Sequence, residues 1–140
     1  FMEPDAQRAI VELSCGEPFL FQLAGQCAWH ASTDSIITAE HVYTGWSRQA
    51  VREAEAHVQR ILDRLPPRER EFVEAMAELA PEERSLTNIA NRLGHKRATD
   101  AGPTAQRLDL TRRIVRRGKH YCFQHRAVGA YLTSEWPEVG

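Results

Sequence analysis

The feature that most restricts the fold is a series of short amphipathic segments in the second half of the chain. Three segments, 67–79, 86–93 and 104–111, repeat apolar residues at helical spacing. Ser85 precedes the second segment in the position of an N-cap, and Gly94 follows it as a residue suited to the left-handed conformation that ends many helices. These signals predict three consecutive helices joined by short connections.

Two shorter apolar runs, 114–116 and 120–123, follow the third helix and flank Arg117-Gly118-Lys119. A strand, a turn containing glycine and a second strand are typical of a tight β-hairpin. A last helix is expected over 126–132. Three helices and a hairpin in this order predict a winged helix-turn-helix, and the fold class is mainly α with one short hairpin.

The first half of the chain also has helical patterns, over 6–14, 18–31 and 39–65. Two prolines after residue 65 end the last of these, because the residue before a proline is driven out of helical geometry. Thr38 is its expected N-cap, but His41 stands where a full capping box has Glu or Gln. We therefore expect a singly capped, long third helix, with Gly45 as the residue that could interrupt it.

Composition places the chain among ordinary globular proteins, because 42% of its 140 residues are hydrophobic and 26% are charged. No apolar run approaches the roughly 20 residues that a membrane-spanning helix needs. Cys15, Cys27 and Cys122 are an odd number of cysteines at wide spacing, which favours buried thiols in a reducing compartment. The first residues lack the pattern of a signal peptide. We expect a cytoplasmic protein without a membrane partner.

The charge of the chain reverses at about residue 84. Residues 1–83 contain 15 acidic and 7 basic residues, whereas residues 84–140 contain 4 acidic and 11 basic residues. The overall net charge of −1 conceals this asymmetry. A basic half favours a polyanionic partner.

The basic residues gather on the predicted turn, third helix and hairpin. In a helix-turn-helix the second helix of the motif enters the major groove. Gln can pair with adenine and Arg with guanine there, whereas basic residues of the hairpin would contact phosphates. The candidate DNA-binding residues are Lys96, Arg97, Thr104, Gln106, Arg107, Arg112, Arg116, Arg117 and Lys119. A winged helix that binds a protein partner instead of DNA remains an open alternative.

No pattern in the chain indicates catalysis. A phosphate-binding loop of the form G-x-x-x-x-G-K-[ST] is absent. Of His120, Cys122 and His125, strand alternation would place only the first two on one face, so we predict no metal site. Trp29, Trp46 and Trp136 are expected in the core. The carboxylates expected on solvated helix surface are Glu69, Glu71, Glu74, Glu78, Glu82 and Glu83.

The segments 13–25 and 37–42, with Trp29 between them, resemble the helical lid of AAA+/STAND-type ATPases. In that family a G-x-P segment follows the nucleotide-binding core, and an I-T-x-E-x-V segment opens the last lid helix. Residues 65–132 are similar to the winged helix that follows the lid in bacterial members. The resemblance covers nearly the whole chain.

This resemblance implies a lid-like subdomain over residues 1–64 and a winged helix over 65–140, which together form a C-terminal regulatory module. Gly16, Glu17 and Pro18 would lie near bound nucleotide and sense its state, although Glu17 departs from the small, polar or basic residue that is commoner there. The chain itself would hold no cofactor and catalyse nothing. ATP and Mg²⁺ would bind an N-terminal ATPase core that these residues do not contain. Gly-x-Pro is equally typical of a plain helix–loop–helix corner.

A second resemblance links residues 65–72 and 89–94 to the helix-turn-helix of sigma factors and response regulators. Those proteins continue as helix after this motif and have no hairpin wing. The strand–glycine–strand pattern over 114–123 counts against this alternative.

Overall fold

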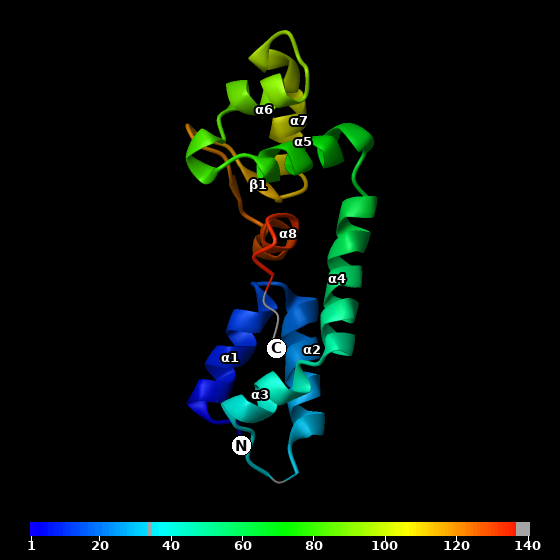
Figure 1. Ribbon diagram of the computed structural model, residues 1–140, viewed down its shortest axis with the longest axis vertical. Helices are drawn as coiled ribbons and strands as arrows, with labels where there is room; N and C mark the ends of the chain where they lie inside the picture. The colour runs from blue at the N-terminus through cyan, green and yellow to red at the C-terminus, as the bar shows by residue number, and fades with distance from the viewer. Residues whose placement is uncertain (34, 137–140) are drawn as a thin grey trace. The chain divides into compact units, whose positions relative to one another are not determined.

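The computed structural model describes residues 1–33 and 35–136. Within them the chain forms eight α-helices and one antiparallel pair of short strands (Figure 1). This confirms the mainly α class with a small hairpin. The chain divides into two compact units, residues 1–60 with Trp136 and residues 61–135. The predicted boundary at residues 64 and 65 lies a few residues after this division.

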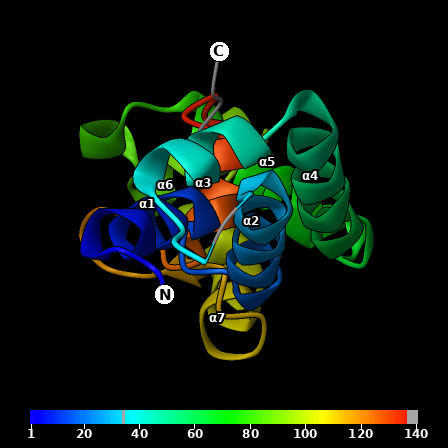
Figure 2. The same cartoon turned by 90° about the horizontal axis from the view of Figure 1, so that it is seen from below.

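The first unit is built on three helices, α1 (Pro4–Ser14), α2 (Pro18–Ala31) and α3 (Ala39–Gly45). Each of the three packs against the other two (Figures 1 and 2). Both α1 and α2 begin at a proline, whose missing N–H group has no partner to lose in the first turn of a helix. The buried apolar residues of these helices include Ala6, Ile10, Leu13, Leu20, Leu23 and Val42.

The long helix expected from Ala39 to Leu65 is interrupted directly after Gly45, the residue that the sequence offers as a break. The chain leaves helical geometry at Trp46 and Ser47 and starts again as α4 (Arg48–Asp63). Ser47 caps the new helix, because its Oγ accepts the N–H of Ala50 at 3.4 Å. The sequence Gly-Trp-Ser therefore combines a helix-ending glycine with a helix-starting serine.

Gly45 ends α3 at a close approach to the backbone of α2. A Cβ atom at this position would lie 2.4 Å from the carbonyl oxygen of Cys27 and 2.7 Å from its carbonyl carbon. Only glycine leaves room for this crossing. The break between α3 and α4 thus coincides with a packing contact that the helical pattern alone does not reveal.

The start of α3 carries a full capping box, contrary to the expectation of a single cap. The N–H of His41 donates to Thr38 Oγ1 at 3.3 Å, and the N–H of Thr38 donates to His41 Nδ1 at 3.1 Å. The imidazole nitrogen takes the place of the carboxylate oxygen that a glutamate would supply.

The second unit contains the predicted series of helices and hairpin. Its helices are α5 (Pro67–Glu78), α6 (Leu86–Arg92), α7 (Gly102–Leu110) and α8 (Arg126–Leu132), with 3-10 turns at η1 (Pro81–Glu83) and η2 (Ala98–Ala101). Helix α5 packs against α6, α7 and α8 (Figure 1). Fully buried side chains that form the core of this unit are Phe72, Val73, Met76, Ile89, Leu108, Val115 and Val128.

The predicted boundaries of α6 are confirmed by its caps. Ser85 Oγ accepts the N–H of Asn88 at 3.1 Å, and Gly94 has a φ of +80°. The left-handed conformation at Gly94 ends the helix without the strain that a side chain would add.

The hairpin consists of β1 (Val115–Arg116) and β2 (Cys122–Phe123), paired antiparallel with Val115 opposite Phe123 and Arg116 opposite Cys122. The five residues between the strands include the predicted turn. Helix α8 packs against β2, and a Cβ atom on Gly129 would lie 2.8 Å from the Cβ of Phe123.

The tryptophans differ from one another in burial. Trp46 is buried as predicted, but Trp29 is 67% exposed, so its assignment to the core is wrong. Among the described residues, no helix combines the length and apolar character required to cross a bilayer.

Candidate nucleic-acid interface

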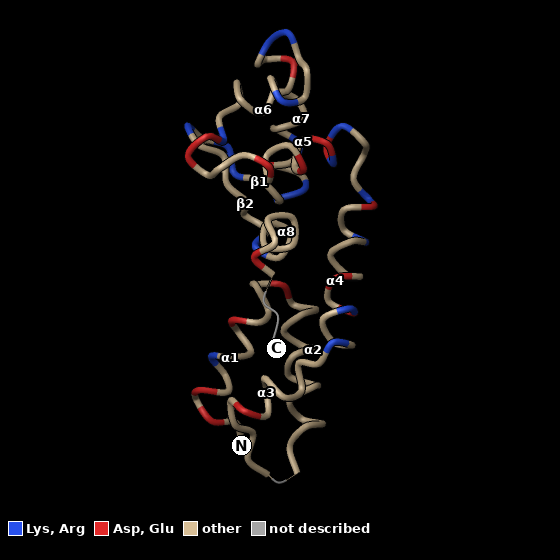
Figure 3. Tube along the Cα trace, viewed as in Figure 1, with Lys and Arg blue, Asp and Glu red and all other residues tan. Residues whose placement is uncertain are grey.

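Lysine and arginine residues of the second unit are found in the turn before η2, at the end of α7, and in and beside the loop between β1 and β2 (Figure 3). Lys96, Arg97, Arg116 and Lys119 are all exposed. Because these side chains lie on or beside connections, their charged groups stay in water and carry no desolvation cost. These four side chains are therefore open to an incoming polyanion.

Helix α7 presents only part of its predicted reading surface. Gln106 and Arg107 are exposed, as a base contact requires. Thr104 is 8% exposed, and its Oγ1 accepts a hydrogen bond from Arg107 Nη2 at 3.5 Å. This burial counts against Thr104 as a contact to DNA, because its side chain faces the core at the first turn of the helix.

Glu69 on the first turn of α5 is the main residue that the sequence analysis misjudged. It was expected on a solvated surface but is 2% exposed. Its Oε1 accepts the Nε–H of Arg112 at 2.9 Å, and its Oε2 lies 3.8 Å from Nε of Arg107. Two candidate DNA-binding arginines therefore share one buried carboxylate.

A signal for this burial is present in the sequence. Glu69 precedes the buried Phe72 and Val73 by three and four residues, so all three lie on one face of α5. A carboxylate on the apolar face of a helix needs a cationic partner, since an unpaired buried charge is costly. Its partners, Arg107 and Arg112, stand 38 and 43 residues later in the chain, so a local sequence pattern does not reveal the ion pairs.

The hairpin arginines differ in their surroundings. Arg117 donates from Nε to Asp109 Oδ2 at 2.9 Å and from its main-chain N–H to the same oxygen at 3.3 Å. The side-chain hydrogen bond from Arg117 lowers the pKa of the Asp109 carboxyl. Arg117 thus ties the hairpin loop to Asp109 near the end of α7, and both Arg117 and the neighbouring Arg116 are exposed.

The Gly16-Glu17-Pro18 segment forms the corner between α1 and α2. Gly16 has a φ of +74°, and Pro18 is the first residue of α2. Glu17 Oε1 accepts the N–H of Phe19 at 3.4 Å and lies 2.9 Å from Nε2 of His57 on α4. Glu17 therefore caps α2 and joins it to α4, and these contacts account for an acidic residue at this position.

Phe19 strengthens the same junction. Its ring stacks on the imidazole of His57, with centroids 4.3 Å apart and planes 13° from parallel. The face of the His57 ring stacks on Phe19, and Nε2 at its edge contacts Glu17. The structure thus brings Glu17, one of the predicted nucleotide-sensing residues, together with His57, which the sequence analysis did not single out.

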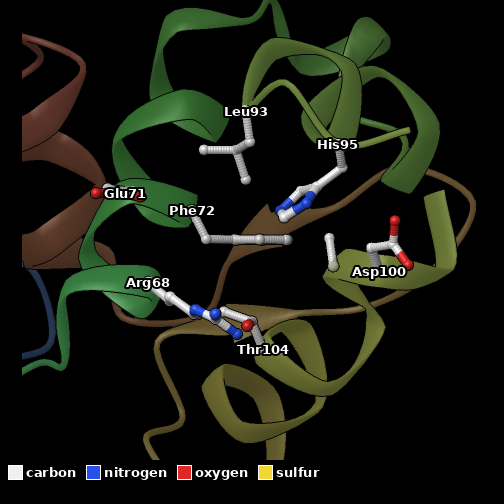
Figure 4. Close-up of a pocket in the computed structure, with 8 residues that line it drawn as sticks. Arg68, Glu71, Phe72, Leu93, His95, Asp100 and Thr104 are labelled. Carbon is white, nitrogen blue, oxygen red and sulfur yellow. The ribbon is translucent and has the colours of Figure 1, made fainter. Parts of the chain in front are cut away.

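A pocket of about 410 Å³ lies in the second unit between α5 and the start of α7 (Figure 4). The side chains of Phe72 and His95 point into it from opposite walls (Figure 4). Arg68 and His95 alternate around it with Glu71 and Asp100. The lining thus includes both basic and acidic side chains.

Metal ligands are not clustered in residues 1–33 and 35–136: no group of three or more His, Cys, Asp or Glu side chains is arranged to hold an ion. His120 and Cys122, the pair considered in the sequence, are both exposed at the hairpin.

Residues 56–120 match one protein family, described as a domain of unknown function (DUF8462). The match begins in α4, includes α5, α6, α7 and β1, and ends before β2. No curated protein and no solved structure matches the chain. Over slightly less than half of its length, the chain is similar to a family whose printed description assigns no activity.

Proposed function

We propose that residues 61–135 form a winged helix-turn-helix that binds duplex DNA. The order of α5, α6, α7 and the β1–β2 hairpin supports this assignment. In such a domain α7 would enter the major groove and the hairpin loop would lie along the phosphate backbone. The hairpin counts against the alternative of a sigma-factor or response-regulator motif.

The observation that carries the proposal is the exposure of basic side chains on two connections of one small unit. Arg116 ends β1 and Lys119 lies in the hairpin loop, and Lys96 and Arg97 lie in the turn before η2. Phosphate contacts of this kind supply affinity without reading sequence. Gln106 and Arg107 on α7 are the residues left to read bases.

We further propose that residues 1–60 are the lid of an AAA+/STAND-type ATPase and that the two units act as its C-terminal regulatory module. The corner at Gly16, Glu17 and Pro18 would respond to nucleotide through the contact of Glu17 with His57 on α4. ATP and Mg²⁺ would be bound by a core outside these residues, so this chain alone should not turn over ATP. The sequence encoded before Phe1 tests this part: a phosphate-binding loop there supports it, and a start codon directly before Phe1 contradicts it.

Binding of the chain to a fluorescent duplex across a salt series tests the DNA proposal. Four phosphate contacts predict a slope of roughly −3 to −4 for log affinity against log salt concentration. No binding at low salt, or binding without salt dependence, would refute it.

A protein partner is the second candidate, and Leu110 favours it. This residue lies one turn beyond Gln106 on α7 and is 59% exposed. An exposed leucine beside Gln106 and Arg107 suits an apolar contact with a protein surface. Salt-insensitive binding to a protein, lost in Leu110→Ser and retained in Gln106→Ala, would support this candidate over DNA.

A further inference from the structure

Two arginines at and just after the end of α7 are held in place by a carboxylate from α5, and one of them also by a hydroxyl of α7 itself. Glu69 on α5 contacts Arg112 at 2.9 Å and Arg107 at 3.8 Å. Thr104 Oγ1 accepts from Nη2 of Arg107 at 3.5 Å. A surface arginine ordinarily samples many rotamers, so such contacts restrict where the guanidinium groups can lie.

The backbone at the end of α7 brings these arginines to one carboxylate. The carbonyl oxygen of Arg107 accepts the N–H of Thr111 at 3.0 Å and of Arg112 at 2.9 Å. The carbonyl oxygen thus accepts two hydrogen bonds, one of the α-helical kind and one that spans five residues, and these fix the backbone from Arg107 to Arg112. The two side chains therefore reach the same buried acceptor from positions five residues apart.

The arginines remain open to solvent on their other sides. The side chain of Arg112 is 38% exposed and that of Arg107 is 51% exposed, against 2% for Glu69. Each guanidinium has five N–H donors, and the contacts described above use only some of them. A buried anion thus sits behind two cations whose other donors are available to a second anion, and the group carries one net positive charge.

We propose that Glu69 is a positioning residue that holds Arg107 and Arg112 as a paired clamp for one backbone phosphate of bound DNA. The inference rests on the proposed function but moves Arg107 from the base-reading set to the phosphate backbone, together with Arg112, so that Gln106 remains as the base-reading side chain of α7. Bidentate guanidinium groups recognise phosphate by geometry as well as charge.

Charge and geometry predict opposite effects when Glu69 is removed. Loss of a carboxylate makes the surface more positive, so charge alone predicts tighter DNA binding. If Glu69 positions the arginines, its loss frees both side chains and weakens binding despite the added positive charge.

The test compares Glu69→Met with Glu71→Met, which removes the same charge from an exposed position on the same helix. Affinity for a duplex is measured at several salt concentrations, after circular dichroism has shown that both variants fold. We expect Glu69→Met to bind about threefold to tenfold more weakly than the original chain, with a log–log salt slope shallower by about one. Glu71→Met should bind as tightly or more tightly.

Arg112→Lys provides an independent test that keeps the charge and the buried carboxylate. Lysine is a point charge and cannot form the paired fork. We expect a loss similar to that of Glu69→Met, whereas Arg113→Lys, at an exposed neighbouring position, should retain affinity.

The outcomes separate this inference from the proposed function. DNA binding that Glu69→Met leaves unchanged or tightens, together with full binding by Arg112→Lys, would overturn the clamp and leave DNA binding intact. Absence of DNA binding by the original chain at low salt would overturn both.

Discussion

Arg84 donates its Nε–H to the main-chain carbonyl oxygen of Met76 at 2.9 Å. A second contact reaches the carbonyl of Leu79 at 3.1 Å, and the guanidinium lies 5.4 Å from the centre of the Phe123 ring. The last carbonyls of a helix often lack partners within it, and Arg84 supplies a donor at the end of α5 to the Leu79 carbonyl and a second donor to the Met76 carbonyl, which also accepts the N–H of Leu79. The residue at which the charge of the chain reverses is 8% exposed and belongs to the core of the second unit.

Replacement of Arg84 should destabilise the second unit. Arg84→Met keeps much of the aliphatic bulk but removes the Nε–H donor from the Leu79 carbonyl and the second donor from the Met76 carbonyl, which keeps the N–H of Leu79, at a cost of roughly 1–3 kcal/mol in the free energy of unfolding. Hydrogen exchange of peptides from α5 and β2 under increasing urea measures this cost. Arg92→Met is the matched control, because its ion pair with Glu78 is exposed and should contribute less than about 1 kcal/mol. Equal stability of the two variants would contradict the capping role.

The crossing of α2 and α3 predicts opposite effects for two glycine-to-alanine substitutions. Gly45→Ala places a Cβ atom against the backbone of Cys27 and should lower the unfolding free energy by about 3 kcal/mol. Gly25→Ala meets no atom within 4 Å inside α2 and should raise it by about 0.5–1 kcal/mol. Urea denaturation followed by the fluorescence of buried Trp46 tests both. A tolerated Gly45→Ala would show that the helices are not in this close contact.

Local features of the fold could be predicted from the sequence, whereas contacts between distant segments could not. Ser85 and Gly94 act within one helix, so their local pattern predicted the ends of α6. Gly45 and Glu69 make contacts with residues far away in the chain, and the local periodicity of apolar residues does not reveal such contacts. The predicted DNA-binding set had the same shortcoming. The sequence places Thr104 among basic residues, but it does not show that the side chain of Thr104 is buried.

The pH dependence of stability should depend on Asp109. Its pKa is lowered by the hydrogen bond from Arg117, so the folded state favours the ionised carboxylate. This contribution is present above the ordinary aspartate pKa of about 3.9 and is lost as pH falls through the lowered value. The stability difference between the original chain and Asp109→Asn should therefore be constant near neutral pH and shrink in acid. A difference that grows on acidification would contradict the pair.

The thiols of Cys27 and Cys122 should react at different rates. Burial raises the pKa of the Cys27 thiol, and the negative charge of Glu53 raises it further. Cys122 is exposed. Because the thiolate is the reactive form, iodoacetamide should modify Cys122 first at neutral pH. Mass spectrometry of digested samples over time gives the order, and faster labelling of Cys27 would contradict its placement.

Reversal of the hairpin charge tests the central claim most directly. Arg116→Glu/Lys119→Glu changes the two exposed basic residues beside Arg117 and leaves its pair with Asp109 in place. Arg48→Glu/Arg52→Glu makes the same change in charge on exposed positions of α4. Measured on one duplex across a salt series, the hairpin variant should bind at least roughly tenfold more weakly, with a slope shallower by about two, and the α4 variant should lose far less. Equal affinity of the two variants would show that the hairpin does not contact DNA.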